Sequence, residues 1–295
     1  MGTRKGIILA GGRGTRLYPM TSTINKQLQS VYDKPMIYYP LTTLMNAGIR
    51  DILIITVGEQ LHHFIGLFEN GNKLGLNIEY AVQNEPRGIS DAFLIGDNVG
   101  FLNSDACTLA LGDNIFYGDE FNKNLYQISK RNKSTIFGYR VSNPSEYGVV
   151  EFDHNNNVIG IEEKPDYPLS NYAVPGLYFY DDTVVERCKE LELSSRGELE
   201  ITDLNNTYIE TGMNVELIKE SAAWFDTGNP EQMFEASMFV KSIQSRTGQM
   251  IGCVEETAYR NNFISHDEFW SLVELMPNSD YRKYMVNKYD FASIV

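Results

Sequence analysis

A group of glycines and cations near the start of the chain has the composition of a phosphate-binding loop. The apolar run GIILA, residues 6–10, leads directly into three glycines, which are Gly11, Gly12 and Gly14. Because glycine has no Cβ, its backbone N–H can approach an anion closely. Thr15, Arg16 and, further along, Lys26 follow the glycines. The carboxyl end of the first parallel strand is where open α/β sheets bind their ligands.

Two common phosphate-binding patterns do not fit this loop. A Walker A motif, GxxxxGK[ST], needs a second glycine five positions after the first, whereas the residue five positions after Gly11 is Arg16. A dinucleotide loop of the form GxGxxG would match Gly12 and Gly14 but has Leu17 in place of the third glycine. The favoured interpretation is a nucleoside-triphosphate loop in which Arg16 and Lys26 carry the charge. A tight turn without a ligand is the alternative.

Two aspartates follow apolar segments that are far apart in the sequence. Asp113 ends CTLALGD, residues 107–113, and Asp226 lies in WFDTG, residues 224–228. One or two protein carboxylates commonly hold Mg²⁺, with phosphates and waters as the other ligands. Asp113 suits this role because it ends an expected strand. From the residues alone, Asp226 better fits the cap of a helix that starts near Pro230.

The elements that must position these groups alternate in the first half of the chain. Expected strands cover residues 6–10, 51–56, 78–82, 107–113 and 134–141, and expected helices cover 36–48, 61–70, 90–98 and 119–133. Pro35 can open the first helix and Gly48 can end it. Strands joined by helices of this length favour parallel crossovers, which predicts an α/β fold with a doubly wound, Rossmann-like sheet.

The pattern changes near residue 145. Two alternating runs around residues 154–157 predict a hairpin over 147–165. Further strands are expected at 172–180 and 215–220, with a helix at 201–212, and four helical stretches follow at 231–245, 254–262, 266–276 and 280–289. We therefore expect an α/β domain with a small β insertion over residues 1–228 and a helical C-terminal extension over residues 229–295.

Composition and charge exclude several classes of protein. The 295 residues are 42% hydrophobic and 22% charged, and their apolar runs are too short to cross a bilayer. The net charge of −14 argues against a nucleic-acid-binding protein, but not against a local pocket for small anions. The cysteines are odd in number and form no CxxC pair, and the N-terminus has no signal-peptide core. These features predict a reduced, cytoplasmic protein without a zinc site or a membrane association.

Motifs spread over most of the chain resemble those of the sugar-nucleotide pyrophosphorylases. The match runs from about Lys5 to at least Asn261 and includes LAGGRGTRL, NKQL, YDKPMIYYPL, QNEPRGISDAF, LGDNIFYG, YGVVEFD, IEEKP, PGLYFYD, GELEITDLN, WFDTG and EETAYRNNFI. Within this family the sequence is similar to the thymidylyltransferases that act on glucose 1-phosphate. The resemblance implies a nucleotidyltransferase fold with a mixed sheet and an Mg²⁺-dependent enzyme. Its substrates would be dTTP and glucose 1-phosphate, and its products dTDP-glucose and pyrophosphate, formed by direct in-line attack on the α-phosphorus.

The resemblance also implies roles for individual residues. Those expected to bind the nucleotide are Leu9, Gly11, Gly12, Gly14, Thr15, Arg16, Gln83, Pro86 and Gly88. Those expected to contact the sugar phosphate are Asn114, Tyr147, Gly148, Glu163, Lys164, Val174 and Trp224. Those expected to take part in catalysis are Arg16, Lys26, Asp113, Lys164 and Asp226, of which Asp113 and Asp226 would bind the metal. From charge pattern alone, Glu163 and Lys164 would instead be a solvated surface pair.

The sequence departs from the family pattern in the loops around the glycines and the base. Asn25 stands where a serine usually precedes the lysine, and Gln29 and Ser30 stand where Leu-Pro is often found. The loop that reads the base has PRGIS where many relatives have a GLA-type run. A single methyl group offers only about 1–3 kcal/mol of discrimination between thymine and uracil. A uridylyltransferase on the same scaffold therefore stays open as an alternative.

A non-catalytic sensor of nucleotide sugars is a second alternative. Its expected mark is the loss of Arg16, Lys26, Asp113 or Asp226, and all four are present. By analogy with the family we expect a homotetramer with feedback inhibition by a dTDP-deoxysugar, in a pathway that makes deoxysugars of the dTDP-rhamnose type for polysaccharide or lipopolysaccharide. Apolar residues of the C-terminal helices could form a subunit interface or pack within the chain; they are Phe234, Met238, Phe239, Trp270 and Leu275.

Overall fold

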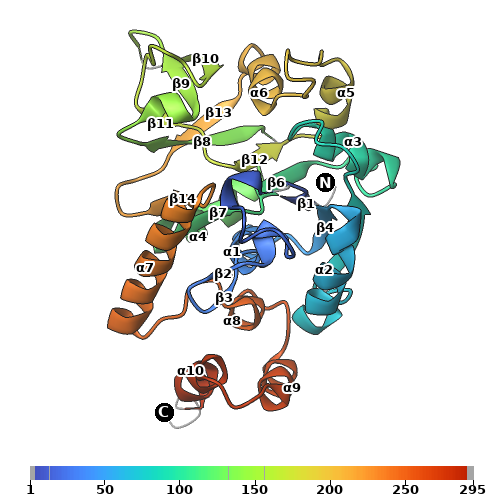
Figure 1. Ribbon diagram of the computed structural model, residues 1–295, viewed down its shortest axis with the longest axis vertical. Coiled ribbons are helices and arrows are strands. Elements are labelled where there is room, and N and C mark those ends of the chain that lie inside the picture. Colours follow the sequence, from blue (N-terminus) through green and yellow to red (C-terminus); the bar gives the residue numbers. More distant parts are fainter. Residues whose placement is uncertain (1–3, 13, 132, 156, 291–295) are drawn as a thin grey trace.

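A mixed sheet forms the centre of the molecule (Figure 1). The computed structural model describes residues 4–12, 14–131, 133–155 and 157–290. Within these residues the main sheet has ten strands, in the order β10-β9-β11-β8-β12-β6-β1-β4-β5, with β13 paired to β8. Arg13 of the glycine loop, Asn156 of the hairpin turn and the last five residues of the expected helical extension lie outside the described residues.

Four parallel strands make the half of the sheet that carries the glycine loop. They are β1 (Lys5–Ala10), β4 (Asp51–Thr56), β5 (Asn77–Val82) and β6 (Cys107–Leu111). β4 and β6 both pair with β1 and lie on opposite sides of it. The chain therefore runs from β1 to one side of the sheet and later returns to the other side of β1. The carboxyl ends of β1 and β6 therefore meet at a topological switch point, where a ligand crevice forms. The predicted doubly wound fold is confirmed.

Antiparallel strands complete the sheet. They are β8 (Thr135–Arg140), β9 (Gly148–Phe152), β10 (Val158–Glu163), β11 (Tyr172–Ala173) and β12 (Leu177–Tyr180), with β13 (Asn214–Leu217) parallel to β8. The predicted hairpin is confirmed as β9–β10. The single strand predicted over 172–180 is wrong: it is divided between β11 and β12, with Pro175, which has no N–H to donate, between the two.

Two small sheets were not expected from the sequence. β7 (Asn114–Tyr117) pairs with β14 (Ala223–Asp226), and β2 (Ser30–Val31) pairs with β3 (Lys34–Pro35). The second pair corrects one prediction. Pro35 lies in β3 and does not open a helix, because α1 begins at Tyr38. Pro40 occupies the first turn of α1, where a missing N–H leaves no helical hydrogen bond unmade.

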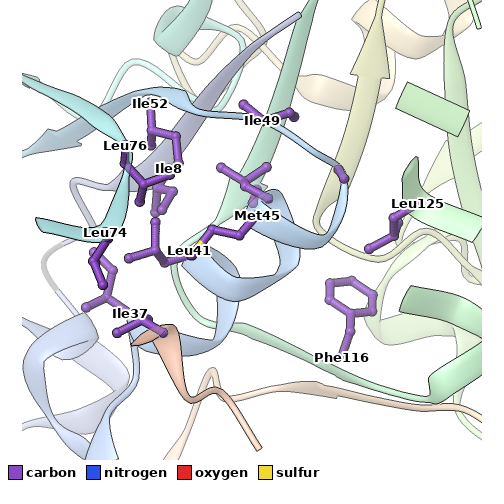
Figure 2. Packing of buried hydrophobic residues seen from close by; sticks show 14 of the residues in the cluster. Ile8, Ile37, Leu41, Met45, Ile49, Ile52, Leu74, Leu76, Phe116 and Leu125 are labelled. Carbon is purple, nitrogen blue, oxygen red and sulfur yellow. The ribbon is translucent and has the colours of Figure 1, made fainter. Parts of the chain in front are cut away.

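Helices cover both faces of the sheet because strand residues alternate between two cores. On β1, Ile7 belongs to one core and Ile8 to the other. Figure 2 shows Leu41 and Met45 of α1 beside Ile8. Helices α1 (Tyr38–Asn46), α2 (Leu61–Phe68) and α4 (Asp119–Ser129) contribute to the Ile8 core, and α3 (Asp91–Asn98), α5 (Val184–Lys189) and α6 (Ile201–Ile209) to the Ile7 core.

Helices make up the C-terminal region of the chain. They are α7 (Pro230–Thr247), α8 (Val254–Arg260), α9 (His266–Leu275) and α10 (Asp280–Tyr289), and α8 to α10 lie at the end of the molecule opposite β9 and β10 (Figure 1). Helices α8 to α10 extend the Ile8 core, whereas Met233 and Val240 of α7 pack in a separate cluster with Leu17. Val254 and Ala258 of α8 share a core with Leu44 and Met45 of α1. The boundary at residue 228 stays a prediction. No helix in the described ranges has both the length and the apolar character needed to cross a membrane.

The candidate interface residues do not share one apolar face. Phe234 and Met238 of α7 are 61% and 48% exposed, and Leu275 of α9 is 82% exposed. Phe239 instead packs against Phe225, and Trp270 against Phe269. The three cysteines are buried and form no disulfide; they are Cys107, Cys188 and Cys253.

Candidate active site

An ion pair joins the turn after β1 to the end of β6. Lys26 Nζ lies 2.5 Å from Asp113 Oδ2. Lys26 begins a short 3₁₀ turn, and Asn25 caps that turn by accepting a hydrogen bond from the N–H of Gln27. The Asn25 side chain also donates to the carbonyl of Ala10, the last residue of β1, at 2.9 Å. Asn25, which departs from the family's usual serine, thus fixes Lys26 at the switch point.

The two aspartates that are far apart in sequence meet at the β7–β14 pair. Asp226 is opposite Asn114, the neighbour of Asp113, in that pair. Thr227 strengthens the pairing of β7 and β14, because its N–H and its hydroxyl both donate to the Asp113 carbonyl, at 3.1 and 2.7 Å. The interpretation of Asp226 as a helix cap is wrong, because Asn229 caps α7 by accepting from the N–H of Gln232.

The two carboxylates have opposite pKa shifts. Burial raises the pKa of Asp226 to about 6, and the negative charge of Asp113 adds to this rise. Burial also acts to raise the pKa of Asp113, but the charge and hydrogen bond of Lys26, with a hydrogen bond from Asn114, outweigh it and the pKa is lowered. Asp113 is therefore ionised over the neutral range, whereas Asp226 bears a charge that the protein alone does not stabilise.

Arg16 approaches the Asp226 side of the crevice. A Cβ placed on Gly228 would lie 3.3 Å from Arg16 Nη2 and 3.4 Å from Asp226 Oδ2, so the guanidinium and the carboxylate flank this glycine. Gly14, before Arg16, has a φ of +61°, a left-handed conformation that favours glycine. Among the described residues other than its chain neighbours, no heavy atom lies within 4 Å of a Cβ placed on Gly12, which leaves the Gly12 backbone open to a ligand. Thr15 begins the 3₁₀ turn that carries Arg16.

Gln83 places a carboxamide over the glycine loop from the end of β5. A Cβ on Gly11 would lie 2.8 Å from Gln83 Oε1. On the other side of β1, the backbone carbonyl of Leu9 accepts a hydrogen bond from the N–H of Gly112, which follows β6. Gly88 has a φ of +95° and lies so close to Leu199 that a Cβ would be 2.5 Å from its carbonyl oxygen. Pro86 is exposed at the tip of this loop. The loop thus joins Gln83 to the segment before α6.

The residues assigned to the sugar phosphate form a second wall. Thr202 Oγ1 donates to Glu163 Oε2 at 2.8 Å, and a Cβ on Gly148 would lie 3.2 Å from the same oxygen. Lys164 Nζ is 3.7 Å from Glu163 Oε1. The Lys164 backbone N–H donates to the carbonyl of Tyr147. Since Glu163 and Lys164 are 37% and 55% exposed, both can still contact a ligand.

Trp224 and Asn114 connect this wall to the aspartates. Trp224 Nε1 donates to Asn114 Oδ1 at 2.6 Å, and the indole packs edge-on against Tyr147 with ring centroids 5.3 Å apart. Asn114 in turn donates to Asp113 Oδ1 at 3.0 Å. Trp224 therefore holds Asn114 in place by a hydrogen bond, in addition to packing against Tyr147. Val174, whose N–H donates to the carbonyl of Gly148, packs partly in the Ile7 core.

Sequence reasoning did not single out Gln27 or Thr202. Gln27 Oε1 is buried without a hydrogen-bond partner in the described part of the chain. Its Cγ would be 2.7 Å from a Cβ on Gly112, so the side chain lies against the backbone next to Asp113. Gln27 belongs to the NKQL motif, which was the available signal. Thr202 lies in GELEITDLN, but only its distance to Glu163 shows a role.

The carboxylate pair fits a magnesium ion. Mg²⁺ takes oxygen ligands and usually needs only one or two carboxylates from the protein. Asp226, with its raised pKa, is a buried carboxylate whose charge a cation would stabilise. Over the described residues there is no cluster of three or more His, Cys, Asp or Glu that could hold a metal ion. Two carboxylates would leave the remaining ligand positions of the ion to phosphate and water oxygens.

A large cavity elsewhere in the protein lacks this chemistry. It has a volume of about 710 Å³ and is lined by residues at the amino ends of β1, β4 and β6, including Arg4, Arg50 and Lys130. Arg4 donates to the carbonyls of Ser129, Cys107 and Tyr180, so its guanidinium holds the backbone together. The switch point, at the opposite ends of these strands, is the better candidate.

The chain matches known proteins along most of its length. The model of the nucleotidyl transferase family matches residues 5–243. A glucose-1-phosphate thymidylyltransferase of Neisseria meningitidis is 49% identical over 284 residues, which are 96% of this chain and 98% of the relative. One from Mycolicibacterium smegmatis is 47% identical over 288 residues, 97% of this chain and 99% of the relative.

Solved structures agree in fold. A Bacillus anthracis protein assigned as a glucose-1-phosphate thymidylyltransferase, crystallised with sucrose, is 38% identical with a TM-score of 0.71, over 80% of this chain and 94% of its own. A UDP-glucose pyrophosphorylase in complex with UDP-glucose has a TM-score of 0.71 at 24% identity, over 82% of this chain and 99% of its own. At that identity the second similarity shows the fold alone.

Proposed function

We propose that this chain, which belongs to the nucleotidyl transferase family, transfers the thymidylyl group of dTTP to glucose 1-phosphate. The products are dTDP-glucose and pyrophosphate. The observation that carries the proposal is the meeting of Lys26, Asp113 and Asp226 at the switch point beside the glycine loop. Relatives bearing this activity in their names are 45–49% identical over nearly the full chain.

The reaction needs two anions to be held in line. A phosphate oxygen of glucose 1-phosphate attacks the α-phosphorus of dTTP, a bond from that phosphorus to the bridging oxygen breaks, and pyrophosphate leaves. Arg16 and Lys26 neutralise the triphosphate, since both lie at the mouth of the glycine loop. Held by Asp113 and Asp226, Mg²⁺ would supply positive charge to the phosphate oxygens. Lys164 is placed to neutralise the sugar phosphate.

Positioning of the two substrates falls to the two walls of the crevice. Gln83 and Gly88 contact the base, with the backbone of Gly11, Gly12 and Gly14 along the nucleotide. Glu163, held by Thr202, accepts hydrogen bonds from sugar hydroxyls. Such positioning accounts for much of the acceleration in phosphoryl-type transfers, because no covalent enzyme intermediate is needed.

The two alternatives from the sequence receive less support. A uridylyltransferase would use the same groups, but the UDP-glucose pyrophosphorylase neighbour is 24% identical and supports the fold only. A sensor without activity would be expected to have lost part of the charged set, whereas Lys26, Asp113, Asp226 and Arg16 are present and lie together.

Assembly, feedback inhibition and place of action extend the same proposal. We further propose a homotetramer inhibited by a dTDP-deoxysugar, working in the cytoplasm in deoxysugar synthesis. Exposed apolar residues such as Phe234 and Leu275 are available for subunit contacts. Sedimentation analysis and inhibition by dTDP-rhamnose test these two points separately.

Pyrophosphate release by the purified protein tests the reaction. Glucose 1-phosphate and Mg²⁺ are supplied with dTTP, UTP, CTP, ATP or GTP in parallel. Release that is greatest with dTTP is the expected result. A preference for UTP would change the nucleotide and keep the mechanism, whereas no release with any nucleotide, despite binding of dTTP, would contradict the proposed activity.

A further inference from the structure

Asp91 is a buried carboxylate outside the groups assigned to either substrate. It is the first residue of α3 and is 6% exposed. Its Oδ2 accepts a hydrogen bond from Gln83 Nε2 at 3.0 Å. Gln83 follows β5 directly, and its N–H continues the sheet by donating to the carbonyl of Thr56. Asp91 thus contacts the side chain that lies over the glycine loop, but not the loop itself.

Two acceptors fix the orientation of the Gln83 carboxamide. Besides Asp91 Oδ2, the carbonyl of Gly88 accepts from Gln83 Nε2 at 3.3 Å. The reversed amide would place Oε1 against a carboxylate and a carbonyl, which are acceptors only. A primary amide has two N–H groups, and these two contacts use both.

The remaining face of the carboxamide is therefore an acceptor. Gln83 Oε1 lies 2.8 Å from the position of a Cβ on Gly11. Among the described residues no hydrogen bond is made to this oxygen. Thymine and uracil carry a donor, the imide N3–H, on the edge that such an acceptor would meet. Cytosine carries a bare N3 acceptor there, which an oxygen would repel.

We propose that Asp91 is a positioning residue for base selection: by holding the Gln83 amide with Oε1 toward the base, it favours imide pyrimidines over cytosine. The inference rests on the proposed function, in which Gln83 contacts the base. A site built around one acceptor discriminates strongly against a partner that lacks the matching donor, because the buried polar group is then left unpaired. Asp91 itself does not touch the nucleotide.

The position of Asp91 at the start of α3 suggests a purely structural role as the competing explanation. A carboxylate in the first turn of a helix interacts favourably with the helix dipole. In that case the replacement of Asp91 would lower stability, and it would change the activity with all nucleotides by the same factor. A ratio of activities with two nucleotides separates the two roles.

Asp91→Leu and Asp91→Asn make the test. Leucine removes the acceptor, so the Gln83 amide can turn its N–H toward cytosine. We expect the ratio of kcat/KM for dTTP to that for CTP to fall about tenfold, which corresponds to the loss of one hydrogen bond's preference. Asparagine keeps an acceptor oxygen, so this ratio should stay within about threefold of the wild type. Asp97→Leu, on the same helix, is the matched control and should leave the ratio unchanged.

The outcomes distinguish the inference from the function on which it rests. An unchanged dTTP:CTP ratio in Asp91→Leu, with both activities lowered together, would overturn the inference. Wild-type protein that releases no pyrophosphate with any nucleotide would instead overturn the proposed function. If the leucine variant unfolds, Asp91→Ala replaces it, and calorimetric affinities for dTTP and CTP supply the same ratio for a variant too slow to assay.

Discussion

Lys26 Nζ lies 2.5 Å from Asp113 Oδ2, although the two residues are 87 positions apart in the chain. Their side chains are 6% and 23% exposed, so the pair is largely withdrawn from water. It joins the turn after β1 to the end of β6 through the protein's own side chains. A cation and a carboxylate that are already in place need little rearrangement when a triphosphate and a metal arrive, which is how preorganised sites lower a barrier.

Replacement of Lys26 by glutamine should therefore affect both activity and stability. We expect kcat to fall by at least about a hundredfold, as for the loss of one preorganised charge-stabilising group. The free energy of unfolding should fall by roughly 1–3 kcal/mol, since Asp113 loses its partner while remaining partly buried. Steady-state kinetics and urea denaturation measure the two effects. Lys219→Gln, which removes an exposed lysine paired with Glu120, should leave both unchanged, and equal effects at the two sites would refute the role of Lys26.

Asp226→Asn should make the metal-free protein more stable while abolishing activity. The folded-state pKa of Asp226 is about 6, above its ordinary value of 3.8. Above pH 6 the carboxylate is ionised in both states, and its ionisation costs the folded state about 1–3 kcal/mol. As the pH falls below the ordinary pKa of 3.8 it becomes protonated in both states and the cost disappears. Asparagine removes the cost, so the gain in stability should be full near pH 7.5 and only a small fraction of that at pH 4.

Thermal or urea unfolding in a chelator, at pH 4 and at pH 7.5, measures this gain. Asp119→Asn, at the exposed start of α4, is the control and should give no gain in stability at pH 7.5. A variant no more stable than the wild type at pH 7.5 would contradict the account of Asp226 as a destabilising carboxylate that a cation is needed to neutralise.

The elements with strong local patterns were predictable. The strand Asp51–Thr56 is a continuous apolar run, and the helix Asp280–Tyr289 starts after a serine cap; both match the sequence prediction. β7 and β14 were missed because each is only four residues long and exists by pairing with a partner more than a hundred residues away. Such pairing leaves no periodic signal in either segment.

The candidate site was predictable to the extent that its groups belong to local motifs. Residue type and position were enough to predict phosphate binding by the glycine loop and metal binding by Asp113. Asp226, judged from the residues alone, fitted a helix cap, and only the family resemblance predicted that it binds a metal. Asp91 and Thr202 lie within the motifs QNEPRGISDAF and GELEITDLN, but their residue types do not indicate a role. Each acts on one side chain, Gln83 or Glu163, and their hydrogen bonds depend on how separate segments pack.

Gly12→Ala should weaken nucleotide binding without weakening the fold. In the described part of the chain, apart from the chain neighbours of Gly12, no heavy atom lies within 4 Å of a Cβ at this position, so the free energy of unfolding should change by less than about 0.5 kcal/mol. The methyl group would occupy the space in which the backbone approaches the triphosphate, and we expect KM for dTTP to rise about tenfold. Gly66→Ala, in α2 and also without a contact within 4 Å, is the control. An unchanged KM for dTTP in Gly12→Ala would show that the triphosphate does not bind against the Gly12 backbone.

Thr202→Val should affect only the sugar side. Valine has the shape of threonine without the hydroxyl that donates to Glu163 Oε2 at 2.8 Å, so the carboxylate becomes free to turn. We expect KM for glucose 1-phosphate to rise about three- to tenfold, the effect of one hydrogen bond, with KM for dTTP unchanged. Thr207→Val is the matched control, because its hydroxyl donates only to the Leu204 carbonyl on the same helix. A parallel rise in both KM values would show that Thr202 supports the fold of the crevice and does not orient Glu163.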